Sequence, residues 1–232
     1  MMPTIKPLGD SAITIIFGNE IDESINEQVF SLFDQLQKQN LSFIKDIIPA
    51  YASLSVVYDV MQIREMGERS AYHYMQTLIE KNLEQPLQTR LSGQKVIAVP
   101  VCYDESLGFD LIDMSRQKNL NIEEIVRIHT EKTYRVYMVG FLPGFAYMGT
   151  VDERIETPRK AVPDNNVAAG SVGIADAQTG IYPLNSPGGW NIIGQTPLKI
   201  FDARDETPCL FKPGDTVKFV SITLDEFYYL QT

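Results

Sequence analysis

The sequence is short of the residues that build metal sites and disulfide frameworks. Its 232 residues include two cysteines, Cys102 and Cys209, and two histidines, His73 and His129. The cysteines lack metal-ligand spacing and are too few for a disulfide framework, which is typical of a protein from a reducing cytosol. A classical zinc site needs clustered Cys and His ligands, so we predict no metal for this chain.

Positive charge and long apolar runs are also scarce. Lys and Arg number 20 against 30 Asp and Glu, which gives a formal net charge of -10. Nucleic acids and anionic membranes select for clustered Lys and Arg, so neither is expected as a partner. No run approaches the ~20 apolar residues of a membrane helix, and the opening MMPTIKPLGD has no apolar signal core. We therefore expect a cytoplasmic protein.

The first half of the chain instead contains alternating strand and helix signals. The pattern predicts strands at 12–17, 43–48 and 53–58 and helices at 21–39 and 67–83. With a further strand at 95–103, the order β-α-β-β-α-β is that of a ferredoxin-like, split βαβ sandwich. The polar stretch 84–94 is either a linker or a loop before the last strand of this sandwich. We place a small α/β domain at 1–92 and a second domain at 93–232.

The second domain begins with helical signals near 107–130 and then becomes mostly β. Asn121 can cap the stronger helix, since Glu124 follows three residues later. After Thr133, short strands are separated by Gly and Pro, and nine of the fifteen glycines fall within 140–194. Short strands with frequent turns indicate a barrel or a sandwich.

One segment of this domain is almost free of charge. Between Asn165 and Leu198 the only charged residue is Asp176, and the stretch contains the only tryptophan, Trp190. Two explanations are open: the glycines make turns while Trp190 fills a core, or backbone N–H and amide groups bind a polar ligand. We favour binding, because turns alone do not require so little charge. Because Asp176 and, poorly, Tyr182 are its only titratable groups, the segment predicts a binding surface or half of an active site.

Candidate ionisable groups lie just outside the neutral segment. His129 is predicted at the end of a helix, where it either caps the helix or takes part in catalysis. Arg159 follows Pro158 and either binds a carboxylate or phosphate or is an ordinary surface charge. Neither a GxxxxGK[ST] loop nor a GxGxxG motif is present, so a nucleotide site of those kinds is excluded.

Several longer motifs resemble one protein family. YRVYMVGFLPGFAYMG (134–149), AAGSVGIADAQTGIYPLNSPGGWNIIGQTPLKIFD (168–202) and KPGDTVKF (212–219) resemble the KipI / allophanate-hydrolase-subunit-1 family. The resemblance spans nearly the whole chain. It implies an α+β protein, in which a cyclophilin-like β-barrel at 93–232 follows the smaller α/β domain.

The resemblance also implies an activity and partners. Family members include a component of the ATP-dependent 5-oxoprolinase, which opens 5-oxo-L-proline to L-glutamate, and an inhibitor that binds a sporulation histidine kinase. For the enzyme, the expected partners are a second cyclophilin-like subunit and a LamB/YcsF-type subunit, with ATP as co-substrate of the complex. The enzyme is our leading hypothesis and the kinase inhibitor the alternative.

The motif positions give a set of candidate site residues. We predict catalytic roles for His129, Arg159 and Gln178. We predict that a further set binds substrate or lines a groove: Phe145, Gly170, Ser171, Thr179, Tyr182, Gly188, Gly189 and Trp190.

Overall fold

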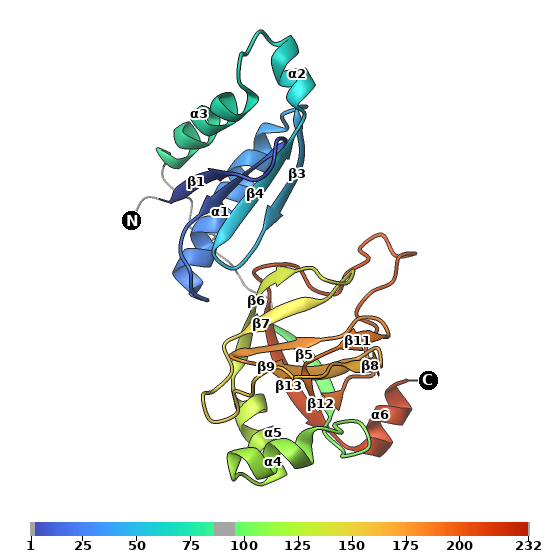
Figure 1. The fold of residues 1–232 in the computed structure, drawn as a ribbon. Helices are drawn as coiled ribbons and strands as arrows, with labels where there is room; N and C mark the ends of the chain where they lie inside the picture. Colours follow the sequence, from blue (N-terminus) through green and yellow to red (C-terminus); the bar gives the residue numbers. More distant parts are fainter. Residues whose placement is uncertain (1–2, 86–95, 232) are drawn as a thin grey trace. The chain divides into compact units, whose positions relative to one another are not determined.

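The computed structural model describes residues 3–85 and 96–231 and divides the chain into two compact units, Met1–Ser92 and Gly93–Thr232 (Figure 1). Most of the predicted linker 84–94 lies outside the described residues.

The N-terminal unit contains a four-stranded antiparallel sheet with the strand order β1-β2-β4-β3. Its elements are β1 (Thr4–Pro7), β2 (Ala12–Ile16), α1 (Glu23–Gln39), β3 (Ile44–Pro49), β4 (Ser53–Tyr58), α2 (Val60–Glu65) and α3 (Ala71–Leu83). Strand β4 lies between β2 and β3, so β2-α1-β3 is a split βαβ unit. Alternate residues of β4, Leu54, Val56 and Tyr58, are buried against α1 and α3 in one hydrophobic core.

The last strand of the predicted sandwich lies elsewhere. Strand β5 (Val96–Cys102) pairs with strands of the C-terminal unit, so the alternative in which 95–103 completes the N-terminal sheet is wrong. The place beside β2 is taken by β1, which precedes it in the chain. The sequence analysis missed β1 because its four residues TIKP have no buried side chain and hence no alternating apolar pattern.

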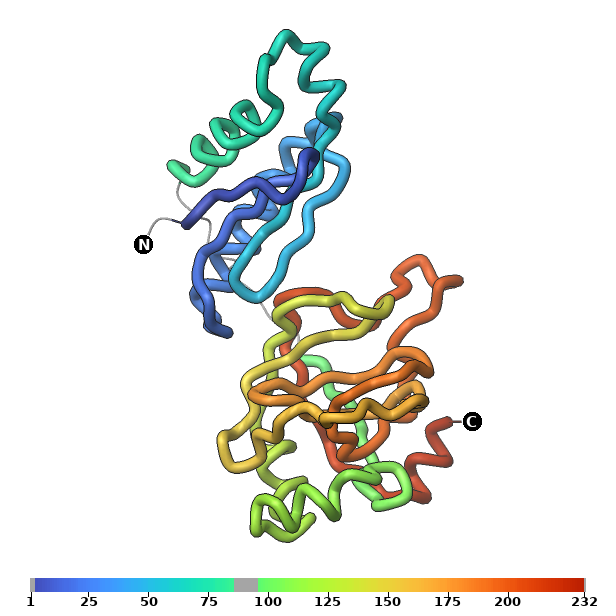
Figure 2. The backbone as a smooth tube through the Cα atoms, in the orientation of Figure 1, coloured from blue at the N-terminus to red at the C-terminus, as the bar shows by residue number. Residues whose placement is uncertain are grey.

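The C-terminal unit is a closed seven-stranded barrel with the strand order β10-β7-β6-β13-β5-β12-β9. After β5 its elements are α4 (Leu111–Lys118), α5 (Ile122–Glu131), β6 (Thr133–Val139), β7 (Ala146–Gly149), β8 (Asp164–Val167), β9 (Ser171–Ala175), β10 (Gln178–Ile181), β11 (Ser186–Gly188), β12 (Asn191–Gln195), β13 (Thr216–Ile222) and α6 (Leu224–Leu230). Strands β8 and β11 form a separate two-stranded ribbon. In Figure 2 the green segment of β5 runs beside the red segment of β13, with which it pairs in parallel. The predicted cap of α5 is confirmed, because Asn121 accepts a hydrogen bond from the Glu124 amide at 2.7 Å.

Two hydrophobic cores lie on opposite faces of the barrel wall. All seven strands contribute side chains to the inner core, which also includes residues of α4 and α5. A second group, which we call the outer core, consists of Phe145, Val167, Ala175, Tyr182, Trp190 and Ile192. Neighbours in sequence alternate between the two: Ile174 and Ile193 are in the inner core, and Ala175 and Ile192 are in the outer core. Since successive strand residues point to opposite faces, the outer core lies outside this wall.

The two cores account for the neutrality of strands β9 and β10 within this segment. Every residue of β9 and β10 is buried. A charge on either face of these strands would be desolvated, at a cost far above that of an apolar or amide group. Burial on both faces therefore explains the lack of charge in β9 and β10, and ligand binding by the rest of the segment stays a prediction.

Candidate functional site

Four aromatic side chains meet at the outer core. We call Phe145, Tyr147, Tyr182 and Trp190 the outer aromatic cluster. The ring centroid of Phe145 lies 4.7 Å from that of Tyr147, 5.2 Å from that of Tyr182 and 5.3 Å from that of Trp190. The contacts of Phe145 with Tyr182 and Trp190 are edge-to-face and stabilise the packing beyond simple burial. Phe145, Tyr182 and Trp190 are only 1%, 1% and 4% exposed, so they form a packed core rather than the walls of an open groove.

Two adjacent glycines serve this cluster in different ways. A Cβ atom on Gly188 would lie 2.3 Å from the Tyr182 hydroxyl oxygen, so the missing side chain makes room for the tyrosine. A Cβ atom on Gly189 would have no neighbour closer than 3.7 Å. The Gly189 carbonyl instead accepts a hydrogen bond from the Lys160 amide at 2.8 Å, which holds the loop that carries Arg159.

Arg159 is an exposed cation on top of the cluster. Its guanidinium carbon lies 5.9 Å from the ring centroid of Trp190. No carboxylate within 3–85 or 96–231 forms an ion pair with it. Burial raises the pKa of Tyr147 and Tyr182, and the positive charge of Arg159 opposes that rise in both. The arrangement is suited to binding an anionic group, because guanidinium pairs well with carboxylate and phosphate.

A strained loop places a further aromatic side chain beside the cluster. Phe141 has a φ of +74° and is 65% exposed, and its ring lies 5.7 Å from that of Phe145. Hydrogen bonds of 3.0 Å, from Gly140 N to Phe145 O and from Phe145 N to Leu142 O, close the loop tightly. A bulky residue with positive φ is an outlier, and such conformations gather at functional sites.

The loop that carries Arg159 is fixed by a group of charges. Lys160 donates to Asp110 and to Asp164, at 2.7 Å in each case. Burial opposes its charge, but the two carboxylates outweigh that effect and raise the pKa of Lys160. Asp110 also accepts a 2.7 Å hydrogen bond from the Ile192 amide. This group therefore ties the start of α4, strand β12 and the Arg159 loop together.

His129 lies apart from the outer aromatic cluster, in a buried hydrogen-bonded chain. Thr179 Oγ1 donates to the Gly173 carbonyl at 3.0 Å, so it accepts from His129 Nε2 at 2.9 Å. His129 Nδ1 must then accept from the Tyr103 hydroxyl at 2.8 Å. The imidazole ring is fully buried and stacks on Phe219 with centroids 4.6 Å apart. Burial lowers the pKa of His129 to about 3, so the ring is neutral at physiological pH.

The structure brings part of the predicted site together. Phe145, Tyr182, Gly188, Gly189 and Trp190 meet at the outer core with Arg159 above them, whereas His129 and Thr179 belong to the buried chain.

The other predicted residues have structural partners. Gly170 N donates to Tyr182 O at 2.7 Å and Ser171 N to Ala168 O at 3.2 Å, so these two amides are already paired. Gln178 is 8% exposed and begins strand β10, opposite Gly149 and Ala175. Their predicted roles in binding or catalysis stay predictions.

Sequence reasoning missed four residues that shape these sites: Phe141, Tyr147, Tyr103 and Asp110. Phe141 and Tyr147 flank Phe145 in the motif GFLPGFAY, and the clustering of aromatics there was the available signal. Tyr103 and Asp110 gave no local signal, because their partners His129, Lys160 and Ile192 lie 26, 50 and 82 residues away in the sequence.

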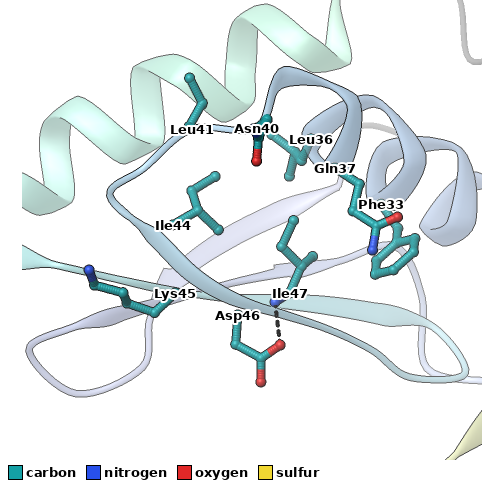
Figure 3. A pocket seen from close by; sticks show the side chains of 9 residues that line it. All are labelled: Phe33, Leu36, Gln37, Asn40, Leu41, Ile44, Lys45, Asp46 and Ile47. Atoms are coloured by element: carbon teal, nitrogen blue, oxygen red, sulfur yellow. Dashed lines mark hydrogen bonds between the residues drawn. The ribbon is translucent and has the colours of Figure 1, made fainter. Parts of the chain in front are cut away.

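Hollows also lie away from the outer core. One of about 240 Å³ in the N-terminal unit is shown in Figure 3, where Ile44 and Ile47 point toward α1 and Lys45 and Asp46 point away. Strand β3, at the edge of the sheet beside this hollow, is protected against pairing with strands of other molecules. A bulge interrupts its register near Lys45, and the Asp46 carboxylate accepts a hydrogen bond from the Ile47 amide at 2.8 Å. A hollow of about 550 Å³ in the C-terminal unit is lined by Tyr103 and residues of α5.

The described part of the chain was searched for metal-binding clusters and for helices that could cross a membrane. Residues 3–85 and 96–231 contain no group of three or more His, Cys, Asp or Glu side chains able to hold a metal ion. No helix in these two ranges is long and apolar enough to cross a membrane.

Comparison with known proteins places the barrel and the preceding α/β unit in the carboxyltransferase class. The family model described as carboxyltransferase domain, subdomain C and D, matches residues 3–211, so the chain belongs to this family. Among characterised relatives, a 5-oxoprolinase subunit of Bacillus subtilis (strain 168) is 38% identical over 227 residues, which cover 97% of this chain and 95% of that protein.

Solved structures share the fold. TTHA0988 matches with a TM-score of 0.79 and 33% identity, over 91% of this chain and 40% of that chain. PH0987 from Pyrococcus horikoshii matches with a TM-score of 0.56 and 42% identity, over 97% of this chain and 100% of that chain. This chain therefore corresponds to less than half of TTHA0988 and to the whole of PH0987.

Proposed function

We propose that this chain is the counterpart of the Bacillus subtilis protein in an ATP-dependent 5-oxoprolinase, which opens 5-oxo-L-proline to L-glutamate together with partner subunits. The observation that carries the proposal is the 38% identity to that 5-oxoprolinase subunit over 97% of this chain and 95% of that protein. Both units of the chain take part in that match. It is therefore a stronger argument than a shared barrel, which many functions can use.

The reaction sets clear chemical demands. Water adds to the lactam carbonyl, the C–N bond breaks, the carbonyl carbon becomes a carboxylate and the nitrogen leaves as an amine that takes up a proton. A lactam carbonyl is a poor electrophile, so its oxygen needs charge stabilisation, and ATP hydrolysis drives the opening. ATP is the co-substrate of the complex in this proposal.

The residues of this chain meet only part of these demands. Arg159 supplies a cation for an anionic group, and this is the role that we assign to it. His129 is buried and neutral, which supports a positioning role through Thr179 rather than proton transfer. The other predicted site residues carry no group that titrates near neutral pH. We therefore assign the general base and the ATP site to partner subunits.

The proposed partners are a second cyclophilin-like subunit and a LamB/YcsF-type subunit. The solved structure of TTHA0988 supports the idea of a larger assembly, since the part equivalent to this chain makes up 40% of its length. In our proposal, separate partner chains correspond to the other part of a protein such as TTHA0988.

Reconstitution tests the proposal. This chain and the two partner subunits from the same organism are purified, and glutamate release and ADP formation are followed for each protein alone, for each pair and for all three. We expect both products only from the complete mixture, in equal amounts, and none without 5-oxo-L-proline. L-Proline, which lacks the lactam carbonyl, serves as the control substrate. A complete, assembled complex without turnover would contradict the proposal.

A further inference from the structure

The backbone on both sides of Arg159 is fixed by hydrogen bonds. On one side, the Pro158 carbonyl accepts from the side-chain amide of Asn191 at 2.9 Å. On the other side, the Lys160 amide donates to the Gly189 carbonyl at 2.8 Å. Proline also restricts the backbone, since its ring fixes φ. Arg159 therefore lies between two anchored residues, although it belongs to a loop and its side chain is exposed.

Asn191 joins this loop to the barrel wall. It is the first residue of β12 and is only 8% exposed. Its side-chain amide donates to the Pro158 carbonyl and also, at 3.1 Å, to the Ile174 carbonyl of β9. A buried amide group costs free energy unless it is hydrogen-bonded. Here one acceptor belongs to the barrel and the other lies next to Arg159, so the Asn191 side chain bridges the two.

The side chain of Lys160 anchors the loop a second time. Its ammonium group donates to Asp110, the residue before α4, and to Asp164, the first residue of β8, at 2.7 Å in each case. The Lys160 side chain is 22% exposed, and its charge is balanced by these two carboxylates. Lys160 is therefore occupied by contacts within the protein, and Arg159 is the neighbouring cation that can bind a ligand.

The Arg159 side chain is left unpaired among these contacts. No carboxylate in the described part of the chain forms an ion pair with it, and its guanidinium carbon lies 5.9 Å from the ring centroid of Trp190. Ordering a loop costs conformational entropy. A cation that is held in one place before binding loses less entropy when it pairs with an anion. A binding site with a preorganised cation therefore explains the anchored backbone and the unpaired charge together.

We propose that Asn191 and Lys160 are positioning residues, which hold Arg159 where it pairs with the carboxylate of 5-oxo-L-proline. This inference rests on the proposed function, in which partner subunits hold ATP, so that the substrate carboxylate is the anion left for Arg159. Asn191 and Lys160 touch no substrate atom and act through the backbone on either side of Arg159. Without them the guanidinium is present but less ordered, and the carboxylate is bound less well.

The order of the loop can be measured on the purified chain without partners. In nitrogen-15 relaxation, the amide of Arg159 should have an order parameter of about 0.85, the value of rigid backbone. Lys160→Met and Asn191→Ala should lower this value toward about 0.6. Lys199→Met, at a lysine that is 61% exposed, is the control and should leave it unchanged. A wild-type value below about 0.6, or wild-type values in both loop variants, would overturn the inference.

A comparison of two substrates on the assembled complex tests the carboxylate contact. 5-Oxo-L-prolinamide has the same lactam as 5-oxo-L-proline but an uncharged amide in place of the carboxylate. The ratio of kcat/KM for the acid to kcat/KM for the amide reports on that contact. Because both substrates meet the same enzyme, the ratio does not depend on how much of a variant is folded. A loss of stability alone therefore leaves it unchanged.

We expect Arg159→Met to lower this ratio about tenfold or more, since a charge-assisted pair is lost. Lys160→Met and Asn191→Ala should lower it about three- to fivefold, because the guanidinium is misplaced rather than removed. Lys160→Arg keeps a cation between the two carboxylates and should retain most of the wild-type ratio. In the Arg159→Met background, Lys160→Met should lower the ratio no further. Arg154→Met, at another exposed arginine, is the matched control and should keep the wild-type ratio.

The outcomes separate this inference from the proposed function. A wild-type ratio in Arg159→Met, or a rise in KM for ATP alone, would show that Arg159 does not bind the carboxylate. A wild-type ratio in both Lys160→Met and Asn191→Ala would show that these residues support only the fold. Each of these results overturns the inference, while turnover by the wild-type complex keeps the enzyme assignment. A complete wild-type complex without turnover contradicts the proposed function, and the relaxation measurement then decides whether Arg159 is held in place.

Discussion

Acidification should destabilise the C-terminal unit through one side chain, His129. In the folded protein burial lowers the pKa of His129 to about 3, against about 6.5 for an unfolded histidine. The unfolded state therefore binds the proton more readily, and stability is lost as the pH falls below 6.5. From these two values, the free energy of unfolding should drop by about 1.4 kcal/mol between pH 8 and pH 5.5, and by about 2 kcal/mol at pH 5.

The chain offers a selective assay for this effect. Trp190 is its only tryptophan and belongs to the same unit as His129, so fluorescence during urea unfolding reports on that unit. His73, the only other histidine, is exposed on α3 of the N-terminal unit. Among the carboxyl groups of the C-terminal unit, that of Asp152, with a pKa of about 2, titrates well below this window.

Matched variants show which histidine causes the pH dependence of the free energy of unfolding. His129→Gln lacks the titrating ring and should lose most of the pH dependence between pH 8 and 5.5, whatever its stability at pH 8. His73→Gln should keep the full dependence. A wild type whose stability is flat over this range, or a His129→Gln variant with the wild-type slope, would refute the reasoning.

Three further predictions concern the outer core and its supports. Gly188→Ala should lower the free energy of unfolding by about 1–3 kcal/mol, because its Cβ would lie 2.3 Å from the Tyr182 hydroxyl. Gly189→Ala, whose Cβ would have 3.7 Å of clearance, is the control and should change little in the same urea assay. Phe141→Gly should be about 1 kcal/mol more stable than Phe141→Ala, because both lose the ring but only glycine relieves the φ of +74°; equal unfolding midpoints would contradict the strain. Lys160→Met should lower the free energy of unfolding by about 1–2 kcal/mol, because Asp110 and Asp164 lose their half-buried cation. Lys199→Met removes an ion pair whose lysine is 61% exposed and should lower it by less than about 0.5 kcal/mol. Equal losses in the two variants would show that the ion pairs of Lys160 add no stability.

The elements that follow a strong local pattern were predictable from the sequence. The helix of residues 23–39 and the strands of residues 44–49 and 53–58 appear close to their predicted positions, because apolar spacing along the chain decides them. Phe145, Tyr182 and Trp190, which were predicted to line one groove, do lie together, in the outer core. The edge strand β1 was not predictable, since none of its side chains is buried.

Burial and long-range contacts account for the rest. A segment without charged residues is expected both where it lines a ligand site and where it lies between two hydrophobic cores. Only the barrel topology shows that β9 and β10 lie between two cores. The tautomer of His129 is set by hydrogen bonds with Tyr103 and Thr179, which lie 26 and 50 residues away in the sequence. The predicted catalytic roles of His129, Arg159 and Gln178, and the alternative of a histidine-kinase inhibitor, stay predictions.

The seam between β5 and β13 has a consequence for synthesis in the cell. These strands pair in register from Val96–Thr216 to Cys102–Ile222, so each residue meets a partner 120 positions later in the chain. At translation rates of about 5–20 residues per second, β5 waits roughly 6–24 s for its main partner. During that interval its apolar edge is open to pairing with other chains. The barrel therefore closes only after β13 has been synthesised, and the edge of β5 that β13 covers stays unpaired until then.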